Sequence, residues 1–150
     1  MGHTFTNNLY HFVFSTKRRQ PFLRPDIRNR IIRYMCGIAR KKGGIPLRVN
    51  AVDEHVHMLV KLRPDVTVSD FLQHVKGDSS KWISDSFPEM LSFAWQAGYS
   101  SFTVSESLRE NVAAYISMQE EHHSRRSFSQ ELSLLLEKNG VPFDREHFLD

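Results

Sequence analysis

The chain has 150 residues, of which 40% are hydrophobic and 25% are charged. This ordinary globular composition excludes a disordered or collagen-like chain, and no apolar run approaches the roughly 18 residues of a membrane-spanning helix. The length favours a single domain, and no secretory signal is expected, because no basic start is followed by an apolar run. The one cysteine, Cys36, cannot form an internal disulfide and is typical of a reducing compartment.

The formal net charge of +3 conceals an uneven distribution along the chain. Residues 1–50 contain 11 Lys or Arg and one acidic residue, residues 51–100 contain 4 and 7, and residues 101–150 contain 5 and 9. Most charged runs are simply solvated, but an excess of this size favours a polyanionic partner, such as nucleic acid or an anionic membrane. Composition alone leaves these alternatives open.

Alternating side chains predict a strand over residues 8–15, whose aromatic face (Tyr10, Phe12, Phe14) points to the core. After a basic loop at 17–19, a helix is predicted from Pro25 to the Gly43-Gly44 pair, with an apolar stripe at helical spacing. The stripe consists of Ile27, Ile31, Met35 and Ile38. Two strands follow over residues 46–52 and 55–62, which form a hairpin.

The second half begins with a helix that a capping box opens at Thr67. A strand is predicted within residues 93–104, with Gly98 as a bulge or turn. A helix over residues 107–124 is expected to start at a second capping box, Ser107 with Glu110, and a last short helix covers 130–138. The order β-α-β-β-α-β is that of an α+β, ferredoxin-like antiparallel sheet, one face of which stays open to a partner or an extra helix.

Two histidines share one side of the strand over residues 55–62. His55 and His57 are about 6.6–6.8 Å apart along a strand, so both imidazoles can converge on one divalent ion. A pair of exposed histidines bonded to their neighbours is the plainer interpretation, and zinc hydrolases use the same spacing. The pattern by itself leaves these alternatives open.

Tyr115 and Gln119 lie four residues apart in the predicted helix, and therefore on one face. A tyrosine in such a position is usually a core residue. Glutamine is less usual in a buried stripe because its amide requires partners, and its oxygen can ligate a hard cation. His122 and His123 are explained more simply as favourable charges at a helix C-terminus.

Four segments together resemble the IS200/IS605-like transposases, including the REP-associated tyrosine transposases, of the single-tyrosine HUH nuclease class. They are LYHFVFSTKRRQPF from Leu9, EHVHMLVKL from Glu54, WQAGYSSFTVS from Trp95 and SLRENVAAYISMQEEHH from Ser107. The resemblance implies one HUH transposase domain over residues 1–150, with a core at about 5–128 and a C-terminal tail at 129–150. It also implies that an added C-terminal helix carries the tyrosine.

The resemblance implies a role for each candidate residue. His55 and His57 match the metal-binding pair, Tyr115 matches the nucleophile, and Gln119 matches the third metal ligand. The family often has aspartate directly before the first histidine, where this chain has Glu54. Whether a carboxylate orients an imidazole here is therefore an open question.

The implied activity is that of a metal-dependent endonuclease and strand transferase, which cleaves and rejoins single-stranded DNA at hairpin-flanked sites. Tyr115 attacks the scissile phosphate, forms a 5′-phosphotyrosine and releases a 3′-hydroxyl, with Mg²⁺ or Mn²⁺ as the cofactor and no nucleotide cofactor. DNA phosphates are expected to bind the basic first third of the chain, at Lys17, Arg18, Arg19, Arg24, Arg28 and Arg33. A homodimer in the bacterial cytoplasm, associated with the nucleoid and not with a membrane, is expected.

Two other classes of protein are alternatives. A non-catalytic DNA-hairpin-binding repressor or domesticated factor of the same fold would have no reason to keep His55, His57, Tyr115 and Gln119 together. A zinc-dependent hydrolase would need a third histidine, cysteine or carboxylate at the usual ligand spacing, and the sequence shows none.

Overall fold

A computed structural model describes residues 2–149 of the chain. Its four strands form one antiparallel sheet in the order β2-β3-β1-β4. The strands are β1 (Asn8–Ser15), β2 (Gly44–Ala51), β3 (His55–Leu62) and β4 (Ser100–Val104). With α1 (Pro25–Lys41) after β1 and α2 (Val68–Ser86) after β3, the chain has the α+β, ferredoxin-like order that the sequence predicts.

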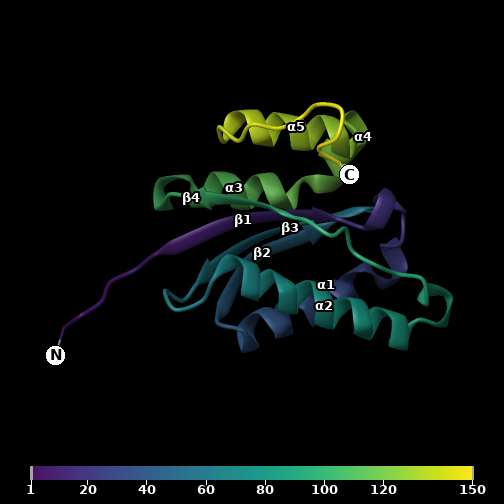
Figure 1. Ribbon diagram of the computed structural model, residues 1–150, viewed down its shortest axis with the longest axis horizontal. Coiled ribbons are helices and arrows are strands. Elements are labelled where there is room, and N and C mark those ends of the chain that lie inside the picture. Colours follow the sequence, from purple (N-terminus) through teal and green to yellow (C-terminus); the bar gives the residue numbers. More distant parts are fainter. Residues whose placement is uncertain (1, 150) are drawn as a thin grey trace.

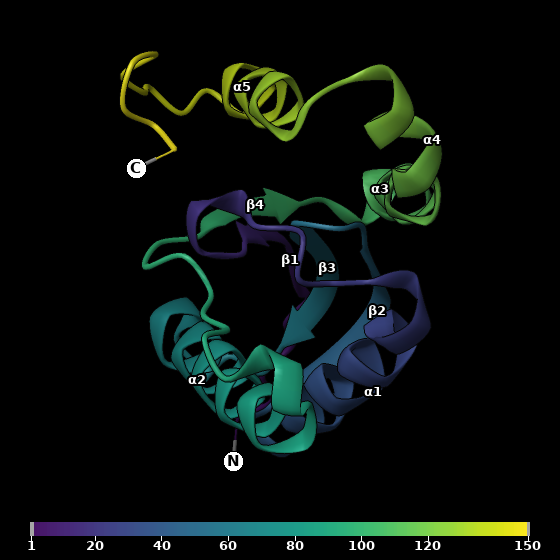
Figure 2. The same ribbon diagram turned by 90° about the vertical axis from the view of Figure 1, so that its right-hand side faces the viewer.

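Helices cover both faces of the sheet (Figures 1 and 2). One face carries α1 and α2. The other carries α3 (Arg109–Ser117), α4 (Gln119–Arg125) and α5 (Phe128–Lys138). The sequence predicted that this second face stays open to a partner or to one added helix, whereas three helices cover it. Within residues 2–149, none of the helices has both the length and the apolar character that a bilayer crossing requires.

The alternation of β1 divides its side chains between the two layers. Phe12 and Phe14 are fully buried in the main core between the sheet and the pair α1 and α2. Val13 points the other way, into a smaller core that includes Phe128 and Leu132 of α5. Because successive residues of a strand face opposite sides, this arrangement also directs His11 toward the layer formed by α3 to α5.

The helix predicted from Pro25 is α1, and all four residues of its apolar stripe are buried. Proline at its first position and Asp26 in its first turn suit the positive end of a helix. At α2, half of the predicted capping box is seen: the Thr67 side chain accepts a hydrogen bond from the Asp70 amide.

The strand predicted within residues 93–104 is shorter than expected. Only Ser100–Val104 pairs with β1, and Trp95 forms an isolated bridge with Thr16. The Trp95 indole donates to the Ser79 hydroxyl of α2 at 2.9 Å, and the Gln96 side chain accepts from the Ser15 amide at 2.6 Å. The aromatic character of this segment therefore reflects packing on α2 and not a continuous strand.

The helix predicted over residues 107–124 is two helices, and the chain breaks at Met118 between α3 and α4. The predicted capping box was wrong. Ser107 lies in a short 3₁₀ turn and shares a hydrogen bond with the Ser105 hydroxyl, and α3 has no side-chain cap. A capping box does form further along the chain, at the start of α5. The Ser127 hydroxyl accepts a hydrogen bond from the Gln130 amide, and the Gln130 side chain accepts one from the Ser127 amide.

Gly44 allows the start of β2 to approach α2 closely. A Cβ atom at this position would lie 2.7 Å from Phe71 Cε1 and 3.0 Å from Val60 Cγ1. Gly44→Ala is therefore expected to lower the free energy of unfolding by about 1–3 kcal/mol. At Gly37, inside α1, an added Cβ would meet no atom within 4 Å, so Gly37→Ala is expected to raise it by about 0.5–1 kcal/mol. Urea denaturation of both variants measures these changes, and a Gly44→Ala protein as stable as wild type would contradict the close packing.

Candidate active site

The first residues of β3 place two imidazoles on the sheet face covered by α3 to α5. His55 pairs with Ser15 of β1 and His57 pairs with Val13, while Val56 between them lies in the main core. Both histidines are almost completely buried. They are therefore not the exposed strand pair that the plainer interpretation assumed.

A carboxylate that the sequence did not indicate stands between the two imidazoles. Glu131 Oε1, from the first turn of α5, lies 2.9 Å from His55 Nε2 and 3.1 Å from His57 Nε2. Glu131 is only 4% exposed. The three side chains offer one ligand atom each, all within 4.8 Å of one another.

Tyr115 and Gln119 approach the same point from α3 and α4. The Tyr115 hydroxyl donates a hydrogen bond to Glu131 Oε2. Gln119 is completely buried, and its Oε1 lies 3.3 Å from His55 Nε2. The structure thus brings together all four residues to which the sequence pointed, and adds Glu131 as a fifth.

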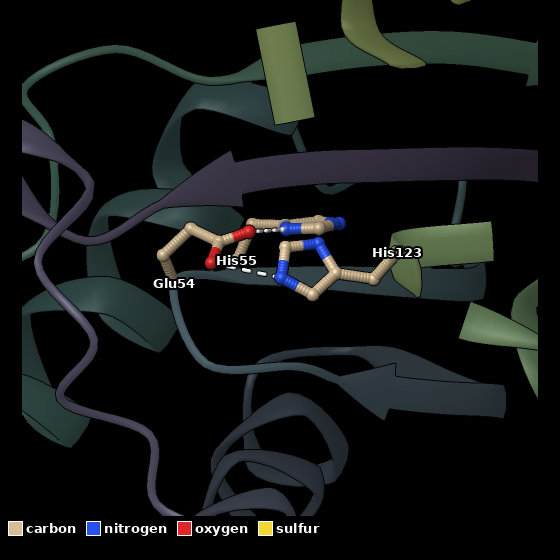
Figure 3. Close-up of side chains that lie close together, drawn as sticks. All are labelled: Glu54, His55 and His123. Carbon is tan, nitrogen blue, oxygen red and sulfur yellow. Dashed lines mark hydrogen bonds and ion pairs between the residues drawn. The ribbon is translucent and has the colours of Figure 1, made fainter. Parts of the chain in front are cut away.

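A second layer of polar groups holds the imidazoles. Glu54 accepts a hydrogen bond from His55 Nδ1 at 2.9 Å, and its other oxygen lies 3.3 Å from His123 Nε2 (Figure 3). His57 Nδ1 and His11 Nε2 share a hydrogen bond of 2.8 Å. In this chain a carboxylate does orient the first histidine, although it is a glutamate, and the Nε2 atoms of both histidines are directed toward Glu131.

These contacts shift the pKa values of the central groups. Burial would raise the pKa of the Glu131 carboxyl, but hydrogen bonds from His55, His57 and Tyr115 hold it well below its usual range. Burial and the same carboxylate raise the pKa of the Tyr115 phenol above its usual value. Burial opposes the charged form of both histidines. At His55 the bonds to Glu131 and Glu54 outweigh burial and raise the pKa, whereas the pKa of His57 is lowered.

The buried His11 links stability to pH. Burial and the neighbouring His57 lower the pKa of His11 to about 3. Since an unfolded histidine titrates near 6.5, protons then bind preferentially to the unfolded chain, and the folded state loses stability as pH falls from about 6.5 toward 3. Between pH 7 and pH 5, wild type is expected to lose about 2 kcal/mol more unfolding free energy than His11→Gln.

Urea denaturation with EDTA present, at both pH values, measures this difference. His74→Gln is the control, because it replaces an exposed histidine on α2, outside the buried cluster. Equal pH dependence in wild type and His11→Gln would contradict the assignment.

The predicted phosphate-binding residues fall into two groups. Lys17, Arg18 and Arg19 form an exposed 3₁₀ turn directly after β1. Thr16 before the turn donates its amide to the Glu54 carbonyl at 2.8 Å. The basic turn therefore lies at the end of the sheet where His55 begins β3.

Unlike the basic turn, two of the three predicted arginines of α1 and its N-cap form ion pairs within the fold. Arg24 forms an ion pair of 2.7 Å with Glu89. Arg28 is buried and pairs with Asp53 at 2.7 Å, so its guanidinium is committed to the fold. Arg33 is exposed on α1, which covers the sheet face opposite α3, α4 and α5 (Figure 2).

A cavity of about 380 Å³ opens beside Tyr115 and Glu131, between β4, α3 and α5. Its walls are mainly apolar, and two cations that the sequence did not single out, Arg126 and Lys138, line it. A ligand in the cavity beside the tyrosine would find both of these cations.

The ring of His122 stacks on Tyr115, with 4.6 Å between the ring centroids. Of the described residues, His122 Nε2 and His123 Nδ1 are the buried side-chain atoms without a hydrogen-bond partner.

A ferredoxin-like sheet that presents a His-x-His pair to a helical tyrosine defines the single-tyrosine HUH class that the sequence resembles. The profile of the family described as "Transposase IS200 like" matches residues 4–119. The chain therefore belongs to the family of IS200-like transposases.

Individual relatives agree with this assignment. The ISDra2 transposase TnpA of Deinococcus radiodurans is 25% identical over 115 residues, covering 73% of this chain and 82% of that protein. The transposase for insertion sequence element IS200 of Salmonella typhimurium is 33% identical over 93 residues, covering 60% of this chain and 59% of that protein. The chain thus matches less than two thirds of the length of the second relative.

Solved structures show the same fold. A crystal structure assigned as a transposase of Deinococcus radiodurans R1 superposes with a TM-score of 0.65 at 25% identity, covering 79% of this chain and 96% of that one. The structure of a REP-associated tyrosine transposase bound to a REP hairpin gives a TM-score of 0.62 at 13% identity, covering 82% and 72%. This second similarity concerns the fold alone.

Glu131 lies beyond residue 119, where the family profile ends. Sequence reasoning missed it because one glutamate among the nine acidic residues of the last third resembles a solvated surface charge. A signal was nevertheless available. After the Ser127 cap, Phe128, Glu131 and Leu132 fall on one helical face at spacings of three and four residues, which directs the glutamate inward.

Proposed function

We propose that this transposase cleaves and rejoins single-stranded DNA at hairpin-flanked sites through a 5′-phosphotyrosine on Tyr115. The observation that carries the proposal is the hydrogen bond of the Tyr115 hydroxyl to Glu131, whose other oxygen touches the Nε2 atoms of both His55 and His57. A tyrosine that served only the core would not need its hydroxyl at the meeting point of two buried imidazoles.

The donor atoms fit a divalent cation. His55 and His57 both direct Nε2 at Glu131 Oε1, and the amide oxygen of Gln119 lies 3.3 Å from His55 Nε2. Imidazole nitrogens and an amide oxygen in this arrangement can ligate a divalent ion. We propose Mg²⁺ or Mn²⁺, and we expect Mn²⁺ to work well because Mg²⁺ prefers a purely oxygen environment. Such a cation, when bound, polarises the scissile phosphate.

In the cleavage step, the phenolic oxygen of Tyr115 forms a bond to phosphorus and the bond from phosphorus to the 3′ oxygen breaks. The phenolic proton ends on the released 3′-hydroxyl. Rejoining is the reverse reaction, in which the 3′-hydroxyl of another strand displaces Tyr115. Because the phosphotyrosine retains the energy of the phosphodiester, no nucleotide cofactor is needed.

Lys17, Arg18 and Arg19 form an exposed basic turn beside the site. Its position supports the proposal that these side chains bind phosphates of the DNA backbone. Replacing Lys17 and Arg18 with alanine is expected to weaken binding of single-stranded DNA and to reduce the slope of log K against log salt by about 1.4, since each single-strand phosphate contact contributes roughly 0.7. Fluorescence anisotropy at several salt concentrations measures the slope. A double replacement of the exposed Arg63 and Lys81 is the control, and equal slopes in both double variants would contradict the assignment.

A single assay tests the proposed function. Wild-type protein is incubated with a labelled single-stranded oligonucleotide that contains imperfect hairpins, in the presence of Mn²⁺, and is then separated on a denaturing gel. A labelled band at the mass of the protein plus DNA is expected. Binding of the oligonucleotide without such a band would support the alternative, a non-catalytic hairpin-binding repressor or domesticated factor.

Glu131 also bears on the zinc-hydrolase alternative. That class was disfavoured because the sequence showed no third ligand, and Glu131 now supplies a carboxylate. Membership in the transposase family and the position of Tyr115 still favour strand transfer, and the covalent band distinguishes it from hydrolysis.

We further propose that residues 1–150 form one HUH domain, and that it acts as a homodimer in the bacterial cytoplasm at the nucleoid.

A further inference from the structure

We propose that Glu131 is itself a metal ligand of this site, beside His55, His57 and Gln119, and that its second oxygen holds the Tyr115 hydroxyl next to the cation. This inference deepens the proposed function, because it adds a residue to that same site. It concerns α5, a part of the chain that the family profile does not cover.

The spacing of the atoms supports ligation. Bonds of about 2.1 Å to one octahedral ion place neighbouring ligand atoms about 3.0 Å apart. Glu131 Oε1 lies 2.9 Å from His55 Nε2 and 3.1 Å from His57 Nε2, and Gln119 Oε1 lies 3.3 Å from His55 Nε2. These three separations are those of neighbouring ligand atoms around one cation, and the ligand atoms of His55, His57 and Glu131 all lie within 4.8 Å of one another.

The chemistry of the donor set supports it as well. With His55, His57 and Gln119 alone, the site offers two nitrogens and one neutral oxygen and carries no negative charge. Glu131 adds a charged oxygen, which is the ligand that Mg²⁺ and Mn²⁺ prefer. A buried carboxylate is costly unless it is paired with a positive charge, and a divalent ion at this site would supply that charge directly to Glu131.

The position of Glu131 is built into the fold. Phe128, Leu132 and Leu136 of α5 are buried with Val13 and Phe102 of the sheet. The Ser127–Gln130 capping box fixes the start of the helix, and the Phe128 ring lies 4.4 Å from the His55 ring. This anchoring distinguishes a ligand held in place from a surface side chain that happens to fall into the site.

The second oxygen of Glu131 gives the residue a positioning role. Glu131 Oε2 accepts the hydrogen bond of the Tyr115 hydroxyl while Oε1 faces the two histidines. One carboxylate would therefore ligate the cation and orient the nucleophile, so that metal binding would be coupled to the orientation of Tyr115.

Metal binding without DNA tests the inference. Isothermal titration of EDTA-treated protein with MnCl₂ gives the affinity, and electron paramagnetic resonance of bound Mn²⁺ reports its ligands. Glu131→Gln is expected to weaken Mn²⁺ binding at least about tenfold and to change the spectrum. Glu131→Asp should retain part of the affinity. Glu137→Gln is the matched control, because Glu137 is exposed on the same helix.

Circular dichroism and thermal unfolding establish that each variant is folded. Unchanged or tighter Mn²⁺ binding by folded Glu131→Gln would overturn the inference, and tighter binding would mean that the carboxylate competes with the metal. The result is separable from the proposed function. Loss of Mn²⁺ binding in Glu131→Gln, with no covalent adduct in wild type, would retain the ligand and reject the phosphotyrosine.

Discussion

Tyr115→Phe is expected to abolish the covalent adduct with single-stranded DNA, with a loss of strand cleavage on the order of 10⁴-fold or more. The substitution removes only the hydroxyl that would attack phosphorus. The phenyl ring keeps the stacking of Tyr115 on His122, at 4.6 Å between centroids, so the helices around the site should stay in place. Affinity for the hairpin oligonucleotide, measured by anisotropy, should therefore remain close to that of wild type.

The control for this experiment is Tyr99→Phe, which changes an exposed tyrosine (40% exposed) outside the site. That variant should form the adduct at the wild-type rate, measured as labelled protein on a denaturing gel over time. Persistence of the adduct in Tyr115→Phe would show that another residue is the nucleophile, and would remove the main support for the proposed mechanism.

His57→Ala is the second change with a large expected effect. His57 touches Glu131 through Nε2 and His11 through Nδ1. Its loss therefore removes one donor from the candidate metal site, leaves the buried His11 Nε2 without its partner, and takes one of three partners from Glu131. We expect Mn²⁺ affinity to fall by about 100-fold or more, because removal even of the groups that support metal ligands costs about 10–100-fold. DNA cleavage should fall with it, because the polarised phosphate is lost.

Calorimetry and the gel assay measure the two effects of His57→Ala separately. Some loss of stability is also expected, since unpaired buried polar groups cost about 1–3 kcal/mol each. The assays are therefore run at a temperature where circular dichroism shows the variant to be folded. His74→Gln serves as the control for histidine replacement. Wild-type Mn²⁺ affinity in folded His57→Ala would contradict the assignment of the metal site.

The sheet and the helices α1 and α2 could be predicted because the sequence patterns that specify them are local. Alternation in residues 8–15, the stripe of α1 and the Thr67 cap each depend on neighbours within a few residues, and each is present in the structure. Prediction was poorer around Trp95 and Met118. There, packing on α2 shortens the expected strand, and a break separates α3 from α4.

The candidate site likewise combines residues that local sequence patterns indicate with features that only tertiary packing sets. His55, His57, Tyr115 and Gln119 could be identified because they occur in motifs of characteristic spacing and order. The whole-chain charge pattern was a weaker guide. Arg28 is buried in the fold through its pair with Asp53, and no count of basic residues distinguishes a structural arginine from one that is free to bind phosphate.

By itself, then, the sequence of this transposase determined its family and the β-α-β-β-α-β order of its core, and singled out the histidine pair and the tyrosine as candidates. Only the tertiary structure decided that the two histidines are buried beneath α3 to α5 and that Glu131 joins them and the tyrosine. The physical reason is that the carboxylate and the histidines are more than 70 residues apart in the chain. Their meeting depends on how the apolar face of α5 packs on Val13 and Phe102, which no local pattern records.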